Sequence, residues 1–250
     1  METSLNKISN DLVLEITGLK KSFGSKEVLK NINLTLKKGE NLVVLGKSGS
    51  GKSVLIKCIV ALIDPDAGRL IVLKEDIATL KIKALNNLRK KIGFLFQSAA
   101  LYDSMTVREN LEFPLREMKF KNSNERDILV KEALENVGLI EAIDKMPSEL
   151  SGGMRKRIGL ARTLILKPEI MLYDEPTTGL DPITAKEISY LILEVQKKQN
   201  TSSIIITHDI ACAKITADRV VVIIDGVFVA EGTYEELEQS KDPIIHSFFE

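Results

Sequence analysis

The glycine-rich segment at residues 46–53 has the residue types and spacing that bind nucleotide phosphates. It reads Gly46, Lys47, Ser48, Gly49, Ser50, Gly51, Lys52 and Ser53, and it matches the pattern G-x-x-x-x-G-K-S at every fixed position. Backbone N–H groups of residues 48–53 can surround the phosphates, Lys52 can contact the β- and γ-phosphates, and Ser53 can offer a hydroxyl to Mg²⁺. Such a match arises by chance in about 1% of chains of this length. The pattern therefore predicts a phosphate loop, and a structural turn is the alternative.

A second candidate anion site follows Leu150. Ser151 can cap a helix expected at about residues 154–166, and Gly152 and Gly153 leave backbone N–H groups open to an approaching anion. We call Ser151, Gly152 and Gly153 the SGG segment. One chain then has two phosphate-binding helix starts, which can close on one nucleotide from opposite sides. That arrangement is simplest if two copies of the chain face each other.

Two carboxylates follow an apolar strand expected at residues 170–173. Asp174 can help to hold hydrated Mg²⁺, and Glu175 can polarise the attacking water, either as a general base or by orienting it. An acidic pair at this position can also be a solvated strand end. Its occurrence after a phosphate loop favours the metal and water site.

Two further polar side chains stand at the ends of expected strands. Gln97 follows residues 92–96, and its amide can reach both Mg²⁺ and the attacking water. His208 follows residues 203–207 and can donate a hydrogen bond to the γ-phosphate. A surface glutamine and a structural histidine are the alternatives. Because ligands of an open α/β sheet bind at the carboxyl ends of its strands, we expect both residues in the catalytic site.

The elements that must position these residues form an α/β pattern. A buried strand at residues 41–45 runs into the phosphate loop, and a helix at 52–61 follows it. The other buried strands are expected at 92–96, 170–173, 203–207 and 219–224, with helical stretches between several of them. Together these elements predict a mostly parallel core sheet.

The remaining elements flank this core. Residues 12–16 and 32–36 alternate like half-buried antiparallel strands, and residues 37–40 read as a turn. Helices are expected at 128–137 and about 154–166, so residues 98–167 form a helical lobe. A hairpin around Asp225-Gly226, a helix near 234–239 and a tail at 242–249 end the chain. We therefore expect a single domain over residues 1–250, with a core at about 1–97 and 168–250.

Composition limits the class of protein. The chain has 250 residues, 44% of them hydrophobic, and its 35 basic and 35 acidic side chains cancel. We therefore expect a globular protein that does not bind nucleic acid through its overall charge. The apolar runs are too short to cross a bilayer, and the first ten residues do not resemble a signal peptide, which predicts a cytoplasmic chain. Cys58 and Cys212 are expected to be buried hydrophobic residues.

These motifs occur in the order found in the ABC-transporter ATPases, and the resemblance covers nearly the whole chain. The motifs are the phosphate loop, Gln97, Leu150 with the SGG segment, Asp174-Glu175, Gly179-Leu180-Asp181 and His208. The resemblance implies a two-lobed P-loop cassette that dimerises head to tail. Each ATP, with Mg²⁺, would lie between the phosphate loop of one chain and the SGG segment of the other. It also implies that Asp181 contacts the opposite site and that Phe23, in the exposed loop at residues 21–24, stacks on adenine.

Two positions depart from the family pattern. Met154 stands where glutamine is commonest, and Lys47 stands where proline is common. Neither position supplies an essential side-chain function. Lys52, Asp174, Glu175 and His208 are all present, so the resemblance implies an active ATPase.

Within the family, residues 95–102, 113–117 and 151–157 most resemble the Mla/MCE group, whose ATPases energise phospholipid or other lipid transport. This resemblance implies separate integral-membrane permease subunits and a peripheral location on the cytoplasmic side of the inner membrane. It also admits an MCE-type lipid-binding protein and a small regulatory subunit as partners. The first alternative is the ATPase of an importer for amino acids or another small solute. A soluble ABC protein without a transport role and a purely structural cassette are further alternatives.

Overall fold

The computed structural model describes residues 11–117 and 122–249. The first ten residues, from which the sequence predicts no signal peptide, lie outside the described residues. Within the described ranges, no helix combines the length and hydropathy needed to cross a membrane.

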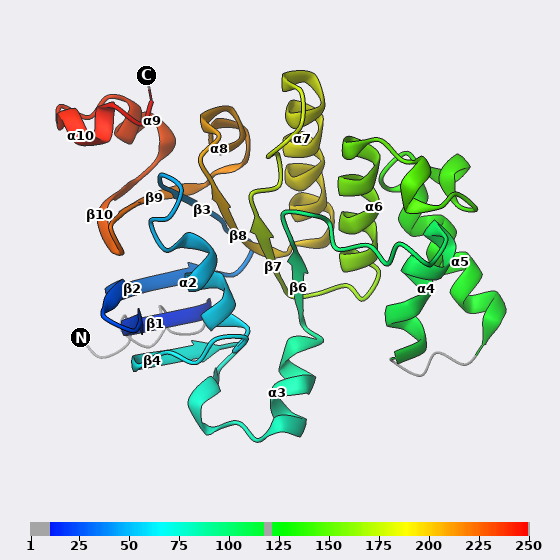
Figure 1. The fold of residues 1–250 in the computed structure, drawn as a ribbon, viewed down its shortest axis with the longest axis horizontal. Coiled ribbons are helices and arrows are strands. Elements are labelled where there is room, and N and C mark those ends of the chain that lie inside the picture. Colours follow the sequence, from blue (N-terminus) through cyan, green and yellow to red (C-terminus); the bar gives the residue numbers. More distant parts are fainter. Residues whose placement is uncertain (1–10, 118–121, 250) are drawn as a thin grey trace.

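A six-stranded sheet forms the centre of the molecule (Figure 1). Its order is β10 (Val227–Gly232), β9 (Arg219–Ile224), β3 (Asn41–Leu45), β8 (Ser202–Thr207), β7 (Ile170–Asp174) and β6 (Ile92–Leu95). All neighbours pair in parallel except β10, which is antiparallel to β9. The predicted mostly parallel core is confirmed. Because the strands are parallel, the ends of β3, β6, β7 and β8 that carry the candidate residues lie along one edge.

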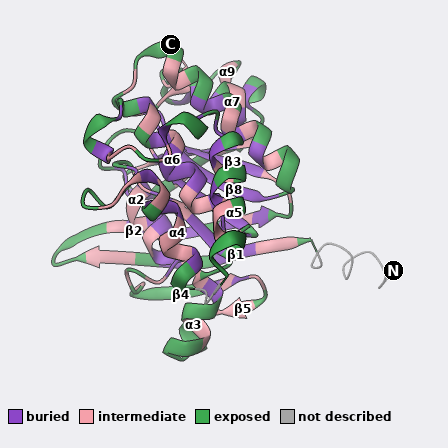
Figure 2. Cartoon of the chain, turned by 90° about the vertical axis from the view of Figure 1, so that its right-hand side faces the viewer, coloured by how far each residue is buried: buried purple, intermediate pink, exposed green. Residues whose placement is uncertain are grey.

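Both faces of this sheet are covered, so the central strands β3, β8 and β7 are buried along their whole length. Figure 2 shows β3 and β8 as buried strands within the molecule, and all five residues of β3 are buried. On one face, α2 (Lys52–Ile59) packs with Val44 and Ile206. On the other face lie α7 (Pro182–Gln199), α8 (Ile210–Thr216), α9 (Tyr234–Glu238) and α10 (Pro243–His246). The side chains of Cys58 and Cys212 are both buried, as predicted.

A smaller antiparallel sheet packs beside α2. Its order is β2 (Lys26–Lys37), β1 (Leu12–Phe23), β4 (Ala67–Val72) and β5 (Glu75–Asp76), and α3 (Ile82–Arg89) follows it. The strands predicted at residues 12–16 and 32–36 are the far ends of one long hairpin. The loop predicted at residues 21–24 was wrong, because Phe23 pairs with Lys26 as the last residue of β1. Half of its surface is nevertheless exposed.

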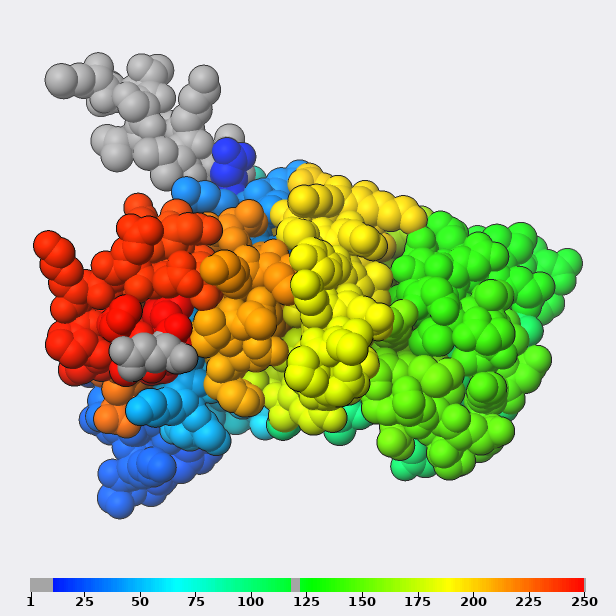
Figure 3. Space-filling model, turned by 90° about the horizontal axis from the view of Figure 1, so that it is seen from above, coloured from blue at the N-terminus to red at the C-terminus, as the bar shows by residue number. Residues whose placement is uncertain are grey.

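The helical lobe contains α4 (Val107–Glu117), α5 (Ser123–Glu135) and α6 (Gly152–Leu164), which share an apolar cluster. Figure 3 shows α7 between this lobe and α8. The predicted start of α6 at about residue 154 was late, because the helix already includes both glycines after its cap Ser151. α5 begins before the predicted residue 128 because Asn122 caps it. The helix predicted at 52–61 ends at Ile59.

Candidate nucleotide-binding site

The phosphate loop joins β3 to α2 with an open helix start. Gly51 is the N-cap of α2 at a φ of 103°, and no side chain caps the helix there. A Cβ atom at Gly51 would lie 2.8 Å from the carbonyl oxygen of Val28, so only glycine fits this conformation and space. The N–H groups in the first turn of α2 thus have no side-chain acceptor at the cap. An uncapped helix start of this kind suits an anion.

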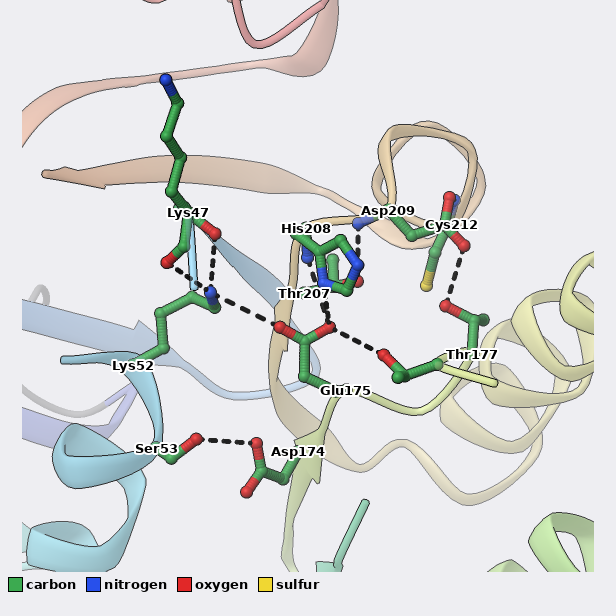
Figure 4. A network of polar contacts seen from close by, with 12 residues as sticks. Lys47, Lys52, Ser53, Asp174, Glu175, Thr177, Thr207, His208, Asp209 and Cys212 are labelled. Carbon is green, nitrogen blue, oxygen red and sulfur yellow. Dashed lines mark hydrogen bonds and ion pairs between the residues drawn. The ribbon is translucent and has the colours of Figure 1, made fainter. Parts of the chain in front are cut away.

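Lys52 points back across this loop (Figure 4). Its Nζ donates to the carbonyl oxygens of Gly46 at 2.6 Å and Lys47 at 3.1 Å. The same Nζ lies 3.4 Å from Oε1 of Glu175, and the Lys52 side chain is only 6% exposed. A buried ammonium is therefore held between the phosphate loop and a carboxylate at the end of β7.

Ser53 and Asp174 bring two oxygen ligands together beside Lys52. The Ser53 hydroxyl donates to Oδ1 of Asp174 at 3.0 Å. Burial raises the pKa of the Asp174 carboxyl, and the hydrogen bond from Ser53 opposes that change. Within residues 11–117 and 122–249, no three His, Cys, Asp or Glu side chains converge on a cation site. Ser53 and Asp174 fit Mg²⁺ of the nucleotide-bound kind, which takes few protein ligands and completes its shell with phosphate oxygens and water.

Glu175 adopts an unusual backbone conformation that directs its side chain to the cleft. Its φ is 51°, in the left-handed region that non-glycine residues rarely occupy. Its Oε2 shares a hydrogen bond of 2.8 Å with Nδ1 of His208 and accepts one from the Thr178 hydroxyl at 3.3 Å. Figure 4 shows the carboxylate between Lys52 and His208. This geometry suits a group that holds or accepts a proton from water.

One cleft of about 530 Å³ contains most of the predicted site. Its lining includes the phosphate loop, Lys52, Ser53, Gln97, Glu175 and His208. Lys26 and Val28 of β2 also line it, whereas Phe23 at the end of the hairpin does not. Near Phe23 the structure places the ammonium of Lys21, 5.5 Å from the ring centroid. The strand ends thus bring four separate sequence motifs to one place.

The SGG segment and Asp181 do not line this cleft and form a second group. Ser151 accepts a hydrogen bond from Met154 N at 3.2 Å, which caps α6. Asp181 caps α7 by accepting from Ile183 N at 3.1 Å and Thr184 N at 3.0 Å. The two helix starts touch, because a Cβ at Gly153 would meet Thr184 Cγ2 at 2.5 Å. The cap position of Asp181 gives it a local structural role that sequence reasoning missed.

Residues 29–178 match the family model described as ABC transporter. The chain belongs to the ABC transporter ATPases. Among solved structures, it resembles the ATP-binding cassette MJ0796, determined as a dimer in a post-hydrolysis state with ADP and Pi. The TM-score is 0.81 at 31% identity, and the match covers 88% of this chain and 98% of MJ0796. The predicted fold class, a P-loop cassette with an antiparallel β subdomain and a helical lobe, is confirmed.

The curated relatives divide over the transported substrate. The probable ribonucleotide transport ATP-binding protein mkl of Mycobacterium tuberculosis is 40% identical over 94% of this chain, which spans 66% of mkl. The intermembrane phospholipid transport system ATP-binding protein MlaF of Haemophilus influenzae is 39% identical, and the match covers 93% of this chain and 88% of MlaF. The methionine import ATP-binding protein MetN of Rhizobium johnstonii is 38% identical over 93% of this chain and 64% of MetN.

This ABC ATPase also contains a buried cation that sequence reasoning missed. Lys156 of α6 is 5% exposed, and its Nζ donates to the carbonyl oxygen of Glu175 at 3.2 Å. Burial lowers the pKa of the Lys156 ammonium, and the nearby carboxylates of Asp174 and Glu175 oppose that change. The available signal was helical spacing, since Lys156 shares a buried face with Gly153 and Leu160.

A hydrogen bond between two loops was missed as well. The Thr177 hydroxyl donates to Oδ2 of Asp209 at 2.8 Å. Asp209 also caps α8 by accepting from Cys212 N at 3.1 Å. The segment after Glu175 is thereby fastened to the segment after His208. No local pattern signals this bond, because its partners lie in loops that follow different strands.

Proposed function

We propose that the chain hydrolyses ATP as the catalytic subunit of a membrane transporter. The observation that carries this proposal is the network in which the Glu175 carboxylate lies between Lys52 and His208, beside the Ser53–Asp174 pair. Lys52 and the N–H groups of residues 48–53 bind the phosphates. Glu175 orients the attacking water and takes its proton, and His208 holds the Glu175 carboxylate and donates to the γ-phosphate.

Ser53 and Asp174 are the proposed Mg²⁺ ligands, and Gln97 lines the same cleft within reach of the metal and the water. When bound, Mg²⁺ neutralises charge on the phosphate oxygens. We propose that the exposed ring of Phe23 packs against the adenine base. Its place at the hairpin end, outside the cleft lining, is compatible with a base that extends beyond the phosphates.

We propose that the working unit is a head-to-tail homodimer. The phosphate loop is open on one side, and the SGG segment lies at an exposed helix start outside the cleft. A partner chain would present its SGG segment to the γ-phosphate and its Asp181 near the same site. The dimeric state of MJ0796 with ADP and Pi supports this arrangement.

We propose phospholipid or another lipid as the substrate of the transporter. The identity to MlaF, which extends over 88% of that protein, supports this proposal together with residues 95–102 and 151–157. The chain would then bind integral-membrane permease subunits at the cytoplasmic side of the inner membrane. An MCE-type lipid-binding protein and a small regulatory subunit would complete the assembly. Methionine or another amino acid is the second candidate, because the identity to MetN is nearly as high.

Purification of the tagged chain from native membranes tests the substrate. We expect a permease and an MCE-type protein to copurify, phospholipid to be enriched, and ATP hydrolysis to stop when EDTA removes Mg²⁺. The Glu175→Gln variant provides the matched control, since it should retain the same partners without hydrolysis. Copurification of an amino-acid permease and a methionine-binding protein would contradict lipid transport and leave the ATPase role intact.

A further inference from the structure

Lys156 lies where the helical lobe meets the segment after β7. Long charged side chains are rarely this buried unless a partner compensates for the lost water. The partner here is a main-chain atom, the carbonyl oxygen of Glu175, at 3.2 Å. The bond therefore acts on the backbone of the proposed catalytic residue and leaves its carboxylate available to Lys52 and His208.

The backbone of Glu175 needs such support. A left-handed conformation at a non-glycine residue costs about 1 kcal/mol or more and persists only where its surroundings hold it. The N–H of Glu175 donates to Ile206 O of β8 at 2.9 Å, and its carbonyl accepts from Thr178 N at 3.3 Å and from Lys156 Nζ of α6 at 3.2 Å. β8 thus holds the N–H side of this residue, and α6 together with the turn to Thr178 holds its carbonyl side. Because φ fixes the direction of the Cβ atom, they also aim the carboxylate.

The same helix begins with the SGG segment. Ser151 caps α6, and Lys156 lies within the second turn of that helix. The start of α6 also packs on the start of α7, because a Cβ at Gly152 would lie 3.5 Å from Leu180 Cδ2. Arg157 adds an ion pair to Glu187 of α7. α6 therefore links the SGG segment at its start to Lys156 and, through the Lys156 hydrogen bond, to the backbone of Glu175.

We propose that Lys156 is a positioning residue that couples the two nucleotide sites of the dimer. This inference rests on the proposed function. In the dimer, the SGG segment of the first chain contacts the ATP that is bound to the phosphate loop of the second chain. Through α6 and Lys156 of the first chain, that ATP orients the Glu175 carboxylate of the first chain. This carboxylate serves the other nucleotide site, at the first chain's own phosphate loop. Each site thereby becomes fully active when the other is filled.

Lys156→Met tests this role in the full chain, because it removes the donor and keeps an unbranched side chain. We expect kcat to fall about tenfold, in line with the loss of one charge-assisted hydrogen bond. The Hill coefficient for ATP should approach that of independent sites, while KM and ATP binding stay within about twofold. Arg155→Met is the matched control, since Arg155 is exposed on the same turn, and it should behave as wild type.

Lys156→Gln keeps an N–H donor, so it should restore kcat to within about threefold of wild type and return the Hill coefficient to the wild-type value. Wild-type kcat and cooperativity in Lys156→Met would overturn the inference. A glutamine variant as impaired as the methionine variant would also overturn it, because the ammonium charge or simple packing would then explain the loss. A wild-type chain that does not hydrolyse ATP would refute the proposed function instead.

Hydrogen exchange tests the positioning role without relying on hydrolysis. The N–H of Glu175, bonded to Ile206 O, should exchange about tenfold faster in Lys156→Met than in wild type, because the Glu175 carbonyl then keeps only the 3.3 Å bond from Thr178 N. Arg155→Met should leave this rate unchanged. Equal exchange in all three proteins would overturn the positioning role whether or not the chain is active.

Discussion

Two helix starts in this molecule are candidate anion sites, and they differ in what surrounds them. The start of α2 has a glycine cap without a side-chain acceptor, and it lies in a cleft with Lys52, Glu175 and His208. The start of α6 is capped by the Ser151 hydroxyl and lies outside that cleft. The first therefore brings together the groups to which we assign phosphoryl chemistry. The second lacks these groups, which fits the cover that we propose it supplies to a partner's site.

The largest difference between the two helix starts should appear when the Glu175 carboxylate, the proposed acid–base group beside the start of α2, is removed. Glu175→Gln removes the proton acceptor at nearly constant shape, so hydrolysis should fall about 10³-fold while ATP binding persists. The variant should also accumulate an ATP-dependent dimer, measured by gel filtration. Glu169→Gln, at an exposed glutamate that pairs with Lys91, is the control and should be active. Normal turnover by Glu175→Gln would remove Glu175 from the proposed mechanism.

A bulky cationic side chain at the start of α6 should reduce ATP hydrolysis while leaving ATP binding by the monomer in place. Ser151→Arg obstructs the anion face of α6, so hydrolysis should fall about 100-fold while ATP binding by the monomer stays measurable. Lys52→Ala should lose hydrolysis because it removes the ammonium group beside the start of α2. A mixed dimer of these two variants contains one site without either change, so mixing should recover part of the activity.

Full activity of Ser151→Arg alone would contradict a site shared between chains. The absence of any recovery on mixing would contradict the head-to-tail arrangement. Ser240→Arg is a suitable control for added charge, because Ser240 follows α9 and does not line the cleft.

The smallest expected effect comes from making the same substitution, glycine to alanine, at both helix starts. Gly51→Ala forces a side chain into a left-handed conformation and against Val28 O, so the free energy of unfolding should fall by about 2 kcal/mol. Gly152 has no positive φ, and its Cβ would meet Leu180 at an ordinary 3.5 Å. Gly152→Ala should therefore keep its stability in urea unfolding and lose activity only. Equal destabilisation by both substitutions would show that the two starts are not distinguished by backbone geometry.

Prediction from sequence succeeded where neighbouring residues determine the structure. The strand at Asn41–Leu45 was predicted with its observed bounds, because a short apolar run before a glycine-rich loop has one reading.

The long helix α7 was given no bounds, although Asp181 followed by Pro182 is a recognisable helix start. Its amphipathic spacing is weak because α7 contacts the core sheet on one side and the helical lobe on the other.

The chain by itself determined the phosphate loop, the acidic pair and the strands that carry them, because contiguous residues encode these features. Only the tertiary structure decided how they meet. The order β3, β8, β7, β6 makes neighbours of strands that are far apart in the sequence, and it brings Glu175 to Lys52 and His208. The bond from Lys156 to Glu175 depends on how the helical lobe packs on the core. Such contacts follow from strand order and packing, which periodicity along the chain does not encode.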